Sequence, residues 1–594
     1  MTERTRCSDF SAANIGQQVR LNGWVQTNRD HGGVTFLDIR DRYGLVQIVV
    51  HPDYPETHDL AHSLRQQDVV EVTGRVVARS PETVNAKLAT GEIEVSALNI
   101  RVLNRAKTPP FTLDDDCDAG EQHRLEYRYL DLRRPVMQRR MVLRHKVTHA
   151  ARTFLDSQSF LEIETPILNK STPEGARDYL VPSRTYPGSC FALPQSPQIF
   201  KQLLMVAGMD RYFQIARCFR DEDLRADRQP EFTQVDLEMS FVEQDDVMAV
   251  AEGLISAMLE AGTGVKLDIP FARINYHEAM DKYGLDKPDL RFGLPLTDIS
   301  DLMRKVEFKV FREPAEKGGL VKVLHVPDGG SLSRKQIDDY TRFVGIYGAK
   351  GLAWIKVNDI TSIPDGLQSP IVKFLPAEVL REILDRVDAK DGDLLFFGAG
   401  DAKVVNDALG NLRNELGRDM GLYDTTAQSF VWVVEFPMFG WNADEKRLEA
   451  LHHPFTAPFA EDMGMLRTEP LAMRSQAYDL VWNGTEIGGG SIRIHDQEIQ
   501  AAVFDALGIS EAEAQSKFGF LLDALQYGAP PHGGLAFGLD RVLALMNGTD
   551  SIRDVIAFPK TQRAADLMCQ SPSEVSDAQL HDLGLRRSRL PSAS

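Results

Sequence analysis

The sequence predicts an α+β protein built from several domains, and three observations lead to this prediction. The chain has 594 residues, more than a single hydrophobic core normally serves. Its first 106 residues contain five short strand-like runs separated by turns. Beyond them, strand-like runs and helical runs occur together through the rest of the chain.

Composition narrows the class of protein. Hydrophobic residues make up 43% and charged residues 26%, as in ordinary globular proteins. No run is long enough to cross a membrane, and the N-terminus lacks the apolar segment of a signal peptide. The five cysteines are scattered, without spacing for zinc or a disulfide framework, so a reducing cytoplasm is expected. The net charge of −19 taken alone argues against a nucleic-acid partner, an expectation that the motifs below overrule.

The first 106 residues are expected to form an OB-fold, because five short strands suit this barrel, which binds single-stranded nucleic acid across one face. A turn at Asn28 to Gly33, followed by Phe36, brings the cation of Arg29 close to a stacking ring. Gln47 offers an amide to a base edge. Alternatively, Phe36 is simply a core residue. The five strand-like runs are 19–25, 34–39, 46–50, 69–77 and 93–102.

A linker follows at 107–137. Proline at 109 and 110 and the acidic run Asp114 to Asp118 keep such a stretch extended and solvated. After Pro135, apolar residues recur at helical spacing, which predicts a helix.

The segment from Phe219 to Gln234 packs charges around a loop between strand-like runs at 211–218 and 232–241. Arg220 ends an apolar run, where burial requires an anion as partner. Alternatively, the segment is a solvated charged hairpin loop. The loop carries further groups that suit a nucleotide: Glu222, Arg228, Gln229 and Phe232.

Two glycine-rich motifs lie downstream. In Gly484 to Arg493, three consecutive glycines allow the backbone to approach a ligand closely, with Glu486 and Arg493 on either side. Glycines 533 and 534 are expected to end a turn, and a helical run follows with Arg541 near its start, where a helix N-terminus already favours anions. The alternatives are a glycine-rich turn and a buried helix with one snorkelling arginine.

The middle of the chain shows no catalytic constellation. Strands are expected at 306–311 and 320–326, and a helix at 401–416. An apolar run at 430–436 suits a buried strand.

Together and in this order, the motifs resemble the three signature motifs of the class II aminoacyl-tRNA synthetases, with Arg220 and Arg541 as the two motif arginines. Within this class the chain resembles the bacterial-type aspartyl-tRNA synthetases over nearly its whole length. Motif 1, the dimer-forming helix and strand, resembles Leu143 to Leu168, where Ser159 stands in place of the family's usual glycine. The other segments that carry the resemblance are 195–201, 219–234, 452–456, 488–493 and 538–541.

The resemblance implies the architecture: an OB-fold β-barrel, a class II antiparallel-sheet catalytic domain and an inserted α/β domain, in a homodimer. The implied boundaries are 1–106 for the anticodon-binding domain, 107–137 for the linker, 138–291 and 425–560 for the catalytic domain, 292–424 for the insertion and 561–594 for a C-terminal extension.

The resemblance also implies the chemistry. Aspartate attacks the α-phosphate of ATP to give aspartyl-adenylate, and the 3′-terminal ribose of tRNA then takes the aspartyl group. Arg220 would clamp the α-phosphate and Arg541 the γ-phosphate, and these two arginines with Glu486 form the implied catalytic set. The implied ATP contacts are Arg220, Asp221, Glu222, Gln229, Phe232, Glu486, Gly538, Leu539, Asp540 and Arg541. Asp479 and Glu486 offer hard oxygen ligands for Mg²⁺.

Aspartate must be distinguished from asparagine, and a cation repels the amide NH₂ of asparagine. Arg493 and Lys201 are the expected partners of the side-chain carboxylate. The full implied aspartate set is Glu174, Gln198, Lys201, Arg220, Asp236, His452 and Arg493.

The range of tRNA substrates depends on the anticodon-binding domain. In the family, histidine at the position of His31 goes with relaxed specificity for tRNA(Asp) and tRNA(Asn), and leucine with strict specificity. Relaxed specificity implies an indirect link to a tRNA-dependent amidotransferase; a strict tRNA(Asp) enzyme is the alternative. The alternatives within the family are an asparaginyl and a lysyl enzyme. Arg493 and Lys201 argue against the lysyl enzyme, and the large insertion between motifs 2 and 3 argues for the bacterial aspartyl type. An RNA-binding protein that has lost catalysis is disfavoured by the intact Arg220, Glu486 and Arg541. The expected anticodon contacts are Arg29, His31, Phe36, Gln47 and Glu82.

Overall fold

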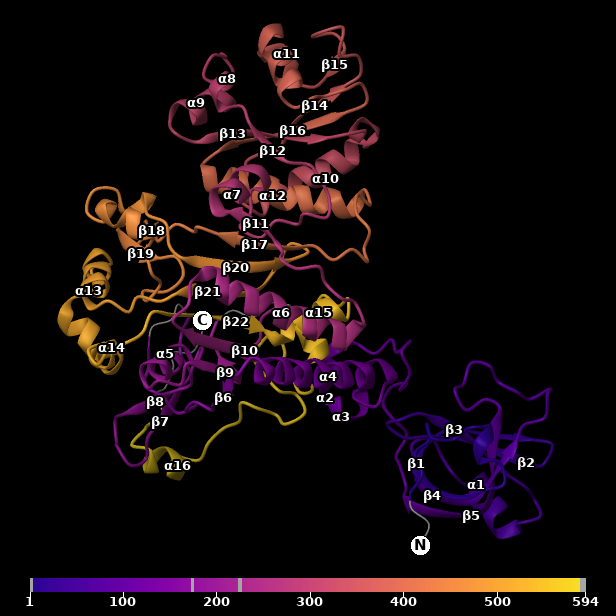
Figure 1. Cartoon of the computed structure of the whole chain (residues 1–594). Helices are drawn as coiled ribbons and strands as arrows, with labels where there is room; N and C mark the ends of the chain where they lie inside the picture. The colour runs from indigo at the N-terminus through magenta and orange to yellow at the C-terminus, as the bar shows by residue number, and fades with distance from the viewer. Residues whose placement is uncertain (1–3, 173–175, 223–226, 588–594) are drawn as a thin grey trace. The chain divides into compact units, whose positions relative to one another are not determined.

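The computed structural model describes residues 4–172, 176–222 and 227–587. The chain forms two compact units (Figure 1). The first comprises Met1–Val142 with Ala557–Thr561 and Ala565–Ser571, and the second comprises Leu143–Ile556 with Gln562–Ala564 and Pro572–Ser594. None of the described helices combines the length and the apolar character needed to cross a membrane.

The first unit contains a closed five-stranded barrel in the order β1-β2-β3-β5-β4, which confirms the predicted OB-fold. Alternate residues such as Leu37 and Ile39 fill the barrel, as a half-buried strand requires. A helix, α1 (Pro55–His62), connects β3 and β4. The strands are β1 (Gln18–His31), β2 (Val34–Arg40), β3 (Leu45–Val50), β4 (Val69–Ala78) and β5 (Ile93–Asn104).

The predicted turn from Asn28 to Gly33 is wrong. β1 continues to His31, and only Gly32 and Gly33 form the turn, with φ of 63° and 82°. Two consecutive residues with positive φ suit the tight hairpin turns whose twist matches the flanking strands, so the strand pairing extends to His31 and Val34.

Short helices follow the barrel: α2 (Glu121–Glu126) and α3 (Arg128–Asp131). Asp131 is fully buried and its carboxylate meets Arg128 at 2.6 Å and Arg134 at 2.9 Å. Arg128 also donates to the carbonyl of Ala557 at 2.8 Å, which fastens the C-terminal segment of this unit.

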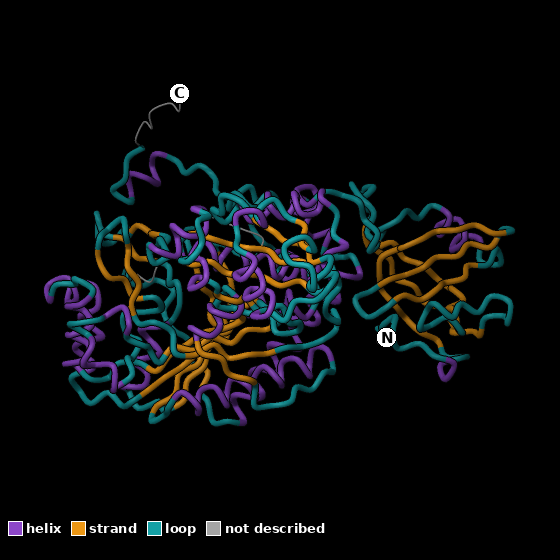
Figure 2. The backbone as a smooth tube through the Cα atoms, turned by 90° about the horizontal axis from the view of Figure 1, so that it is seen from above, coloured by secondary structure: helices purple, strands orange, loops and turns teal. Residues whose placement is uncertain are grey.

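The second unit is centred on an eight-stranded sheet in the order β11-β17-β20-β21-β22-β10-β9-β6 (Figure 1). Figure 2 shows strands of this unit in orange among purple helices. The eight-stranded sheet is antiparallel except for the outer pairs β11–β17 and β6–β9. Buried apolar side chains join it to three helices, α4 (Pro135–Ser157), α6 (Gln244–Thr263) and α15 (Leu539–Met546). The strands are β6 (Leu161–Glu162), β9 (Arg211–Phe219), β10 (Glu231–Ser240), β11 (Ala272–Asn275), β17 (Phe430–Val434), β20 (Ala477–Trp482), β21 (Thr485–Ile492) and β22 (His532–Gly538).

The glycines of the two downstream motifs lie inside strands of this sheet. Gly533 and Gly534 belong to β22, so their predicted placement at the end of a turn is wrong. A Cβ on Gly534 would lie 2.0 Å from Glu238 Oε2, and one on Gly489 of β21 would lie 2.3 Å from Asp479 Oδ1. Glycine is needed at these positions because carboxylates of neighbouring strands occupy the space.

Between β11 and β17 the chain forms α7 (Tyr276–Tyr283) and then a separate five-stranded sheet in the order β12-β13-β16-β14-β15 (Figure 1). One face is covered by α10 (Arg334–Gly345) and α12 (Ala402–Asp419), the other by α8 (Ser300–Met303), α9 (Lys309–Glu316) and α11 (Ala377–Arg386). The strands are β12 (Leu296–Asp298), β13 (Leu320–Val326), β14 (Ala353–Val357), β15 (Leu367–Gln368) and β16 (Leu394–Gly400).

Two predictions for this insertion are confirmed: β13 spans 320–326, and α12 begins after its N-cap Asp401. The strand predicted at 306–311 is wrong, because the chain enters α9 at Lys309. Phe311 and Ala315 are the buried residues of α9, and their spacing of four places both on one face of a helix.

Smaller elements complete the second unit. They are a ribbon of β7 (Leu180–Pro182) and β8 (Cys190–Ala192), a hairpin of β18 (Phe439–Asn442) and β19 (Arg447–Ala450), and the helices α5 (Gln198–Val206), α13 (Gln497–Ala506), α14 (Glu511–Leu525) and α16 (Asp577–Asp582).

Candidate active site

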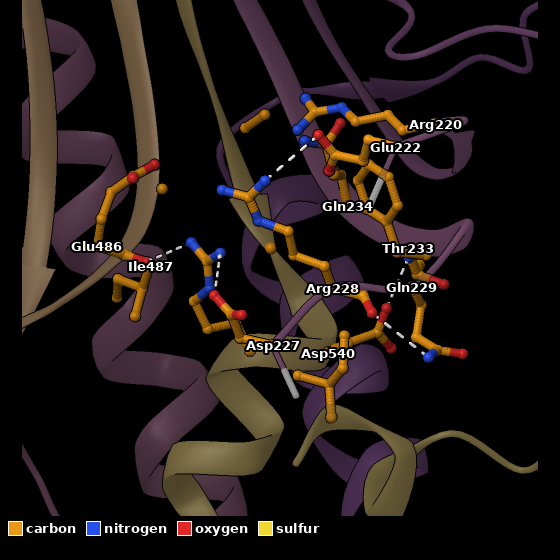
Figure 3. A pocket seen from close by; sticks show the side chains of 16 residues that line it. Arg220, Glu222, Asp227, Arg228, Gln229, Thr233, Gln234, Glu486, Ile487 and Asp540 are labelled. Atoms are coloured by element: carbon orange, nitrogen blue, oxygen red, sulfur yellow. Dashed lines mark hydrogen bonds and ion pairs between the residues drawn. The ribbon is translucent and has the colours of Figure 1, made fainter. Parts of the chain in front are cut away.

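Two adjoining cavities open along the middle of the large sheet. The first has a volume of about 260 Å³ and is walled by the loop between β9 and β10, by β21 and by the start of α15 (Figure 3). The second, of about 470 Å³, lies between α5, β10, β20 and β21. Four residues line both cavities: Arg220, Gln234, Glu486 and Ala536. Any group held by Arg220 therefore faces both spaces.

The first cavity presents Arg220 and Phe232 together. The Arg220 guanidinium lies 5.2 Å from the centre of the Phe232 ring. Its Nε is buried, and no residue in the described part of the chain accepts a hydrogen bond from it. A buried guanidinium donor without a partner is suited to an anion. Arg228 Nη1 lies 3.4 Å from Glu222 Oε2 on the same wall (Figure 3).

Arg541, in the first turn of α15, provides a second cation to this cavity. Its Nη1 donates to the backbone carbonyl of Glu486 at 2.8 Å, and its Nη2 lies 3.7 Å from Asp227 Oδ2 (Figure 3). The two arginines thus approach one space from β9 and from α15, which suits a ligand with several negative groups.

The other predicted nucleotide contacts differ in placement. Gln229 and Gly538 line the cavity, whereas Leu539 is buried in the core and Asp221 lies outside the lining. Asp540 lines the cavity, but its carboxylate accepts from the Thr233 backbone N–H at 2.8 Å and from Arg144 at 2.5 Å. Asp540 therefore fastens α15 to β10 and α4.

Three buried charged residues line the second cavity, Lys201, Asp236 and Arg493, and a fourth, Glu238, contacts two of them. Lys201 Nζ lies 3.2 Å from Asp236 Oδ1 and 3.3 Å from Glu238 Oε2. Arg493 contacts Glu238 in two places, at 2.9 Å and 3.2 Å. We call Lys201, Asp236, Glu238 and Arg493 the charge quartet; its formal charges cancel. Sequence analysis missed Glu238, although its spacing of two from Asp236 places both carboxylates on one face of β10.

Burial and charge act in opposite directions on the two acids of the quartet. Burial raises the pKa of Asp236, and the nearby Lys201 does not overcome it. Burial also raises the pKa of Glu238, but Arg493 and Lys201 outweigh it and leave this pKa lowered. Glu238 is thus the ionised partner that holds Arg493 in place.

His452, Asp479 and Glu486 also line the second cavity. His452 Nε2 lies 3.6 Å from Asp479 Oδ2. Burial and the charge of Asp479 raise the pKa of Glu486. Burial lowers the pKa of His452, but Asp479 outweighs it and raises this pKa overall. By contrast, burial with Arg493 and Lys201 lowers the pKa of His453 to about 3.

The carboxylate of Glu486, whose ionisation burial and the neighbouring Asp479 oppose, suits a hard divalent cation as partner. The described residues contain no cluster of three or more His, Cys, Asp or Glu side chains arranged around a metal, so a cation here would share its ligand shell with a substrate. Gln198 lines the same cavity, as do Tyr276 and Asp286, which sequence analysis missed. The predicted residue Glu174 lies outside the described residues.

The barrel brings three of its five predicted contact residues onto one outer face. Arg29 pairs with Phe36 across β1 and β2, and its Nη2 donates to Asp38 at 2.8 Å. Gln47 donates to Glu94 at 2.8 Å. Phe36 is half-buried and absent from the barrel core, so the alternative that it is a core residue is wrong. His31 and Glu82 lie in exposed positions outside this network.

Comparison with known proteins gives two family matches. Residues 120–562 match the model of tRNA synthetases class II (D, K and N), and residues 19–103 match an OB-fold nucleic acid binding domain. The chain is 55% identical to Aspartate--tRNA(Asp/Asn) ligase of Desulfosudis oleivorans over 98% of this chain and 96% of that one.

Solved structures share the fold at low identity. Asparaginyl-tRNA synthetase from Pyrococcus horikoshii, complexed with asparaginyl-adenylate, superposes with a TM-score of 0.60 at 20% identity, over 94% of this chain and 99% of that one. A putative aspartyl-tRNA synthetase from Leishmania major gives 0.58 at 19% identity, over 94% of each chain.

Proposed function

This chain belongs to the class II tRNA synthetases of the D, K and N group, and from this membership we propose that it attaches L-aspartate to tRNA at the expense of ATP. The observation that supports aspartate as the amino-acid substrate is the charge quartet. Arg493 and Lys201 face a cavity that shares Arg220 with the neighbouring nucleotide cavity. A carboxylate side chain gains from two cations there, whereas an amide NH₂ is repelled.

The geometry divides the first step among the residues. ATP lies in the first cavity with its adenine against Phe232 and its α-phosphate at Arg220, on the shared wall. The aspartate carboxylate approaches from the second cavity and attacks the α-phosphate, and pyrophosphate leaves toward Arg541. Asp479 and Glu486 would hold Mg²⁺, which neutralises charge on the phosphates. Positioning and charge stabilisation supply the rate.

We extend the proposal to both tRNA(Asp) and tRNA(Asn). The relative from Desulfosudis oleivorans carries both in its name, and His31 is the residue that goes with relaxed specificity in the family. The outer face of the barrel, with Arg29, Phe36 and Gln47, would receive the anticodon, and Glu94 joins it through Gln47. Relaxed charging would give aspartyl-tRNA(Asn), which a tRNA-dependent amidotransferase in the same cytoplasm would then amidate.

Aspartylation of purified tRNA(Asp) and tRNA(Asn) transcripts tests the proposal. We expect comparable kcat/KM for the two, and a preference for tRNA(Asp) in His31→Leu. Strong preference for tRNA(Asp) by the unaltered enzyme would leave a strict aspartyl enzyme, and charging of neither would overturn the enzymatic assignment.

The assembly is proposed to be a homodimer through the edge of the large sheet. β6 is the outermost strand, and Leu161, Ile167 and Leu168 are about half exposed beside it. Apolar side chains gathered at an open sheet edge suit a second copy of the chain. The domain boundaries at 106, 137, 291, 424 and 560 form part of the same proposal.

A further inference from the structure

Gln198 stands at the aspartate cavity with an amide whose two ends are nearly equal in shape and opposite in hydrogen bonding. Its carbonyl oxygen accepts hydrogen bonds, and its NH₂ donates them. A rotation by half a turn exchanges the two with little change in packing. Which end faces the cavity therefore decides whether the site attracts or repels a cationic group of the substrate.

A buried chain of hydrogen bonds leads away from this amide. Gln198 Nε2 donates to Gln202 Oε1 at 3.3 Å, and Gln202 Nε2 lies 3.2 Å from His532 Nε2. His532 Nδ1 in turn lies 2.8 Å from the carbonyl oxygen of Pro530. Gln202 and His532 are both fully buried.

The direction of every bond in this chain follows from its last member. A carbonyl oxygen only accepts, so His532 Nδ1 carries the proton that bonds Pro530. Burial lowers the pKa of His532 and keeps the ring neutral, which leaves Nε2 as an acceptor. Gln202 must then donate its NH₂ to His532 and accept from Gln198 through Oε1. Gln198 is thereby left with its own Oε1 free; among the described residues none donates to it.

We propose that Gln202 and His532 are positioning residues that fix the Gln198 amide with its carbonyl oxygen toward the aspartate cavity, where it accepts a hydrogen bond from the α-ammonium of the amino acid. The inference rests on the proposed aspartate site. It separates two tasks in the cavity. Arg493 and Lys201 recognise the carboxylate side chain, and the buried pair Gln202 and His532 orients the Gln198 oxygen that accepts from the ammonium.

The test is Gln202→Met, which keeps the length of the side chain and removes both hydrogen bonds, measured by aspartate-dependent ATP–pyrophosphate exchange. We expect KM for aspartate to rise by about tenfold to a hundredfold, as for loss of one hydrogen bond to a charged group. KM for ATP should stay unchanged. Succinate, a dicarboxylate without the ammonium, should inhibit the variant and the unaltered enzyme with similar inhibition constants.

His532→Phe is the second variant, since it keeps an aromatic ring but removes the Nε2 acceptor, and it should show the same split. Gln500→Met is the matched control. Gln500 is equally buried, and within the described ranges its Nε2 donates to the carbonyl of Pro454 alone, at 3.0 Å. In this control both KM for aspartate and the inhibition constant of succinate should stay unchanged.

Equal weakening of aspartate and succinate by Gln202→Met would overturn the inference, because general damage to the cavity affects both. An unchanged aspartate KM would overturn it too. Absence of aspartate-dependent exchange in the unaltered enzyme is a separate result, which contradicts the proposed function itself.

Discussion

At the scale of single residues, the charge quartet shows how a site can present two cationic side chains to a ligand while both remain paired with carboxylates. Glu238 neutralises part of the charge of Arg493 and Lys201, with which it forms ion pairs. Removing a carboxylate from such a buried set leaves a charge without compensation. The quartet therefore contributes to stability and to recognition through the same atoms.

Glu238→Gln should destabilise the second unit by about 3 kcal/mol, seen as an earlier transition in urea followed by tryptophan fluorescence. Glu231→Gln is the control, because Glu231 pairs with Arg217 at 2.7 Å in a partly exposed position and should cost less than about 1 kcal/mol. Equal effects of the two substitutions would contradict the assignment of Glu238 as a buried counterion.

We expect the proposed binding of Mg²⁺-ATP at Glu486 to depend on pH. Its pKa in the folded protein is above the ordinary value of 4.5. The folded state then holds the proton more tightly than the unfolded chain. The stability that the bound proton contributes is fully present below pH 4.5. It is lost as the pH rises through the pKa of Glu486 in the folded protein.

In the proposed site Mg²⁺ would compete with that proton and compensate the charge of Glu486 once it ionises. The gain in unfolding temperature on adding Mg²⁺-ATP should therefore grow as the pH rises from about 5 to about 8. Glu486→Gln should flatten this dependence, while ATP itself titrates identically in both proteins. A gain that depends on pH equally in the variant would assign the effect to ATP.

At the scale of elements, the end of α4 carries a strained residue. Phe160 N–H bonds to Leu155 O at 3.0 Å and Ser159 N–H to Asp156 O at 2.9 Å. These are the two bonds of a Schellman cap, in which glycine is the usual residue at the position of Ser159. Ser159 has φ of 64°, a left-handed conformation that costs a residue with a Cβ about 1 kcal/mol.

Ser159→Gly should raise the free energy of unfolding by about 1 kcal/mol, measured from the urea midpoint of the second unit. Ser159→Ala keeps the Cβ and serves as the control, with no gain expected. A gain for alanine equal to that for glycine would show that the serine hydroxyl, and not the backbone, carries the strain.

The elements also show where sequence patterns suffice. The five barrel strands were predictable because alternation of residues such as Leu37 and Ile39 is a local signal. The strand predicted at 306–311 was wrong because burial of Phe311 and Ala315 against the inserted sheet favours a helix. Gly489 was expected to allow close approach of a ligand and Gly534 to end a turn. The groups that require glycine there, Asp479 and Glu238, come from other strands, so only the fold reveals them.

At the scale of the whole molecule, the proposed dimer predicts sedimentation at twice the mass of one chain. Ile167→Asp should shift the protein toward the monomer, because it places a charge at the exposed apolar edge beside β6. Val310→Asp is the control, since Val310 is also exposed and apolar but lies in the inserted domain. Dissociation by both substitutions, or by neither, would argue against this edge as the interface.

The placement of the inserted domain has a consequence for synthesis. β11 and β17 are parallel neighbours, with Ala272 opposite Val431, and the domain forms the crossover between them. Loop-closure entropy grows only with the logarithm of length, so the domain costs little stability, yet contacts so distant in sequence form slowly. The ribosome adds Arg220 to the growing chain before the inserted domain. It adds Asp479, Arg493 and Arg541 only near the end of synthesis. Amino-acid activation therefore becomes possible only after α15 has been synthesised, when translation of the enzyme is almost finished.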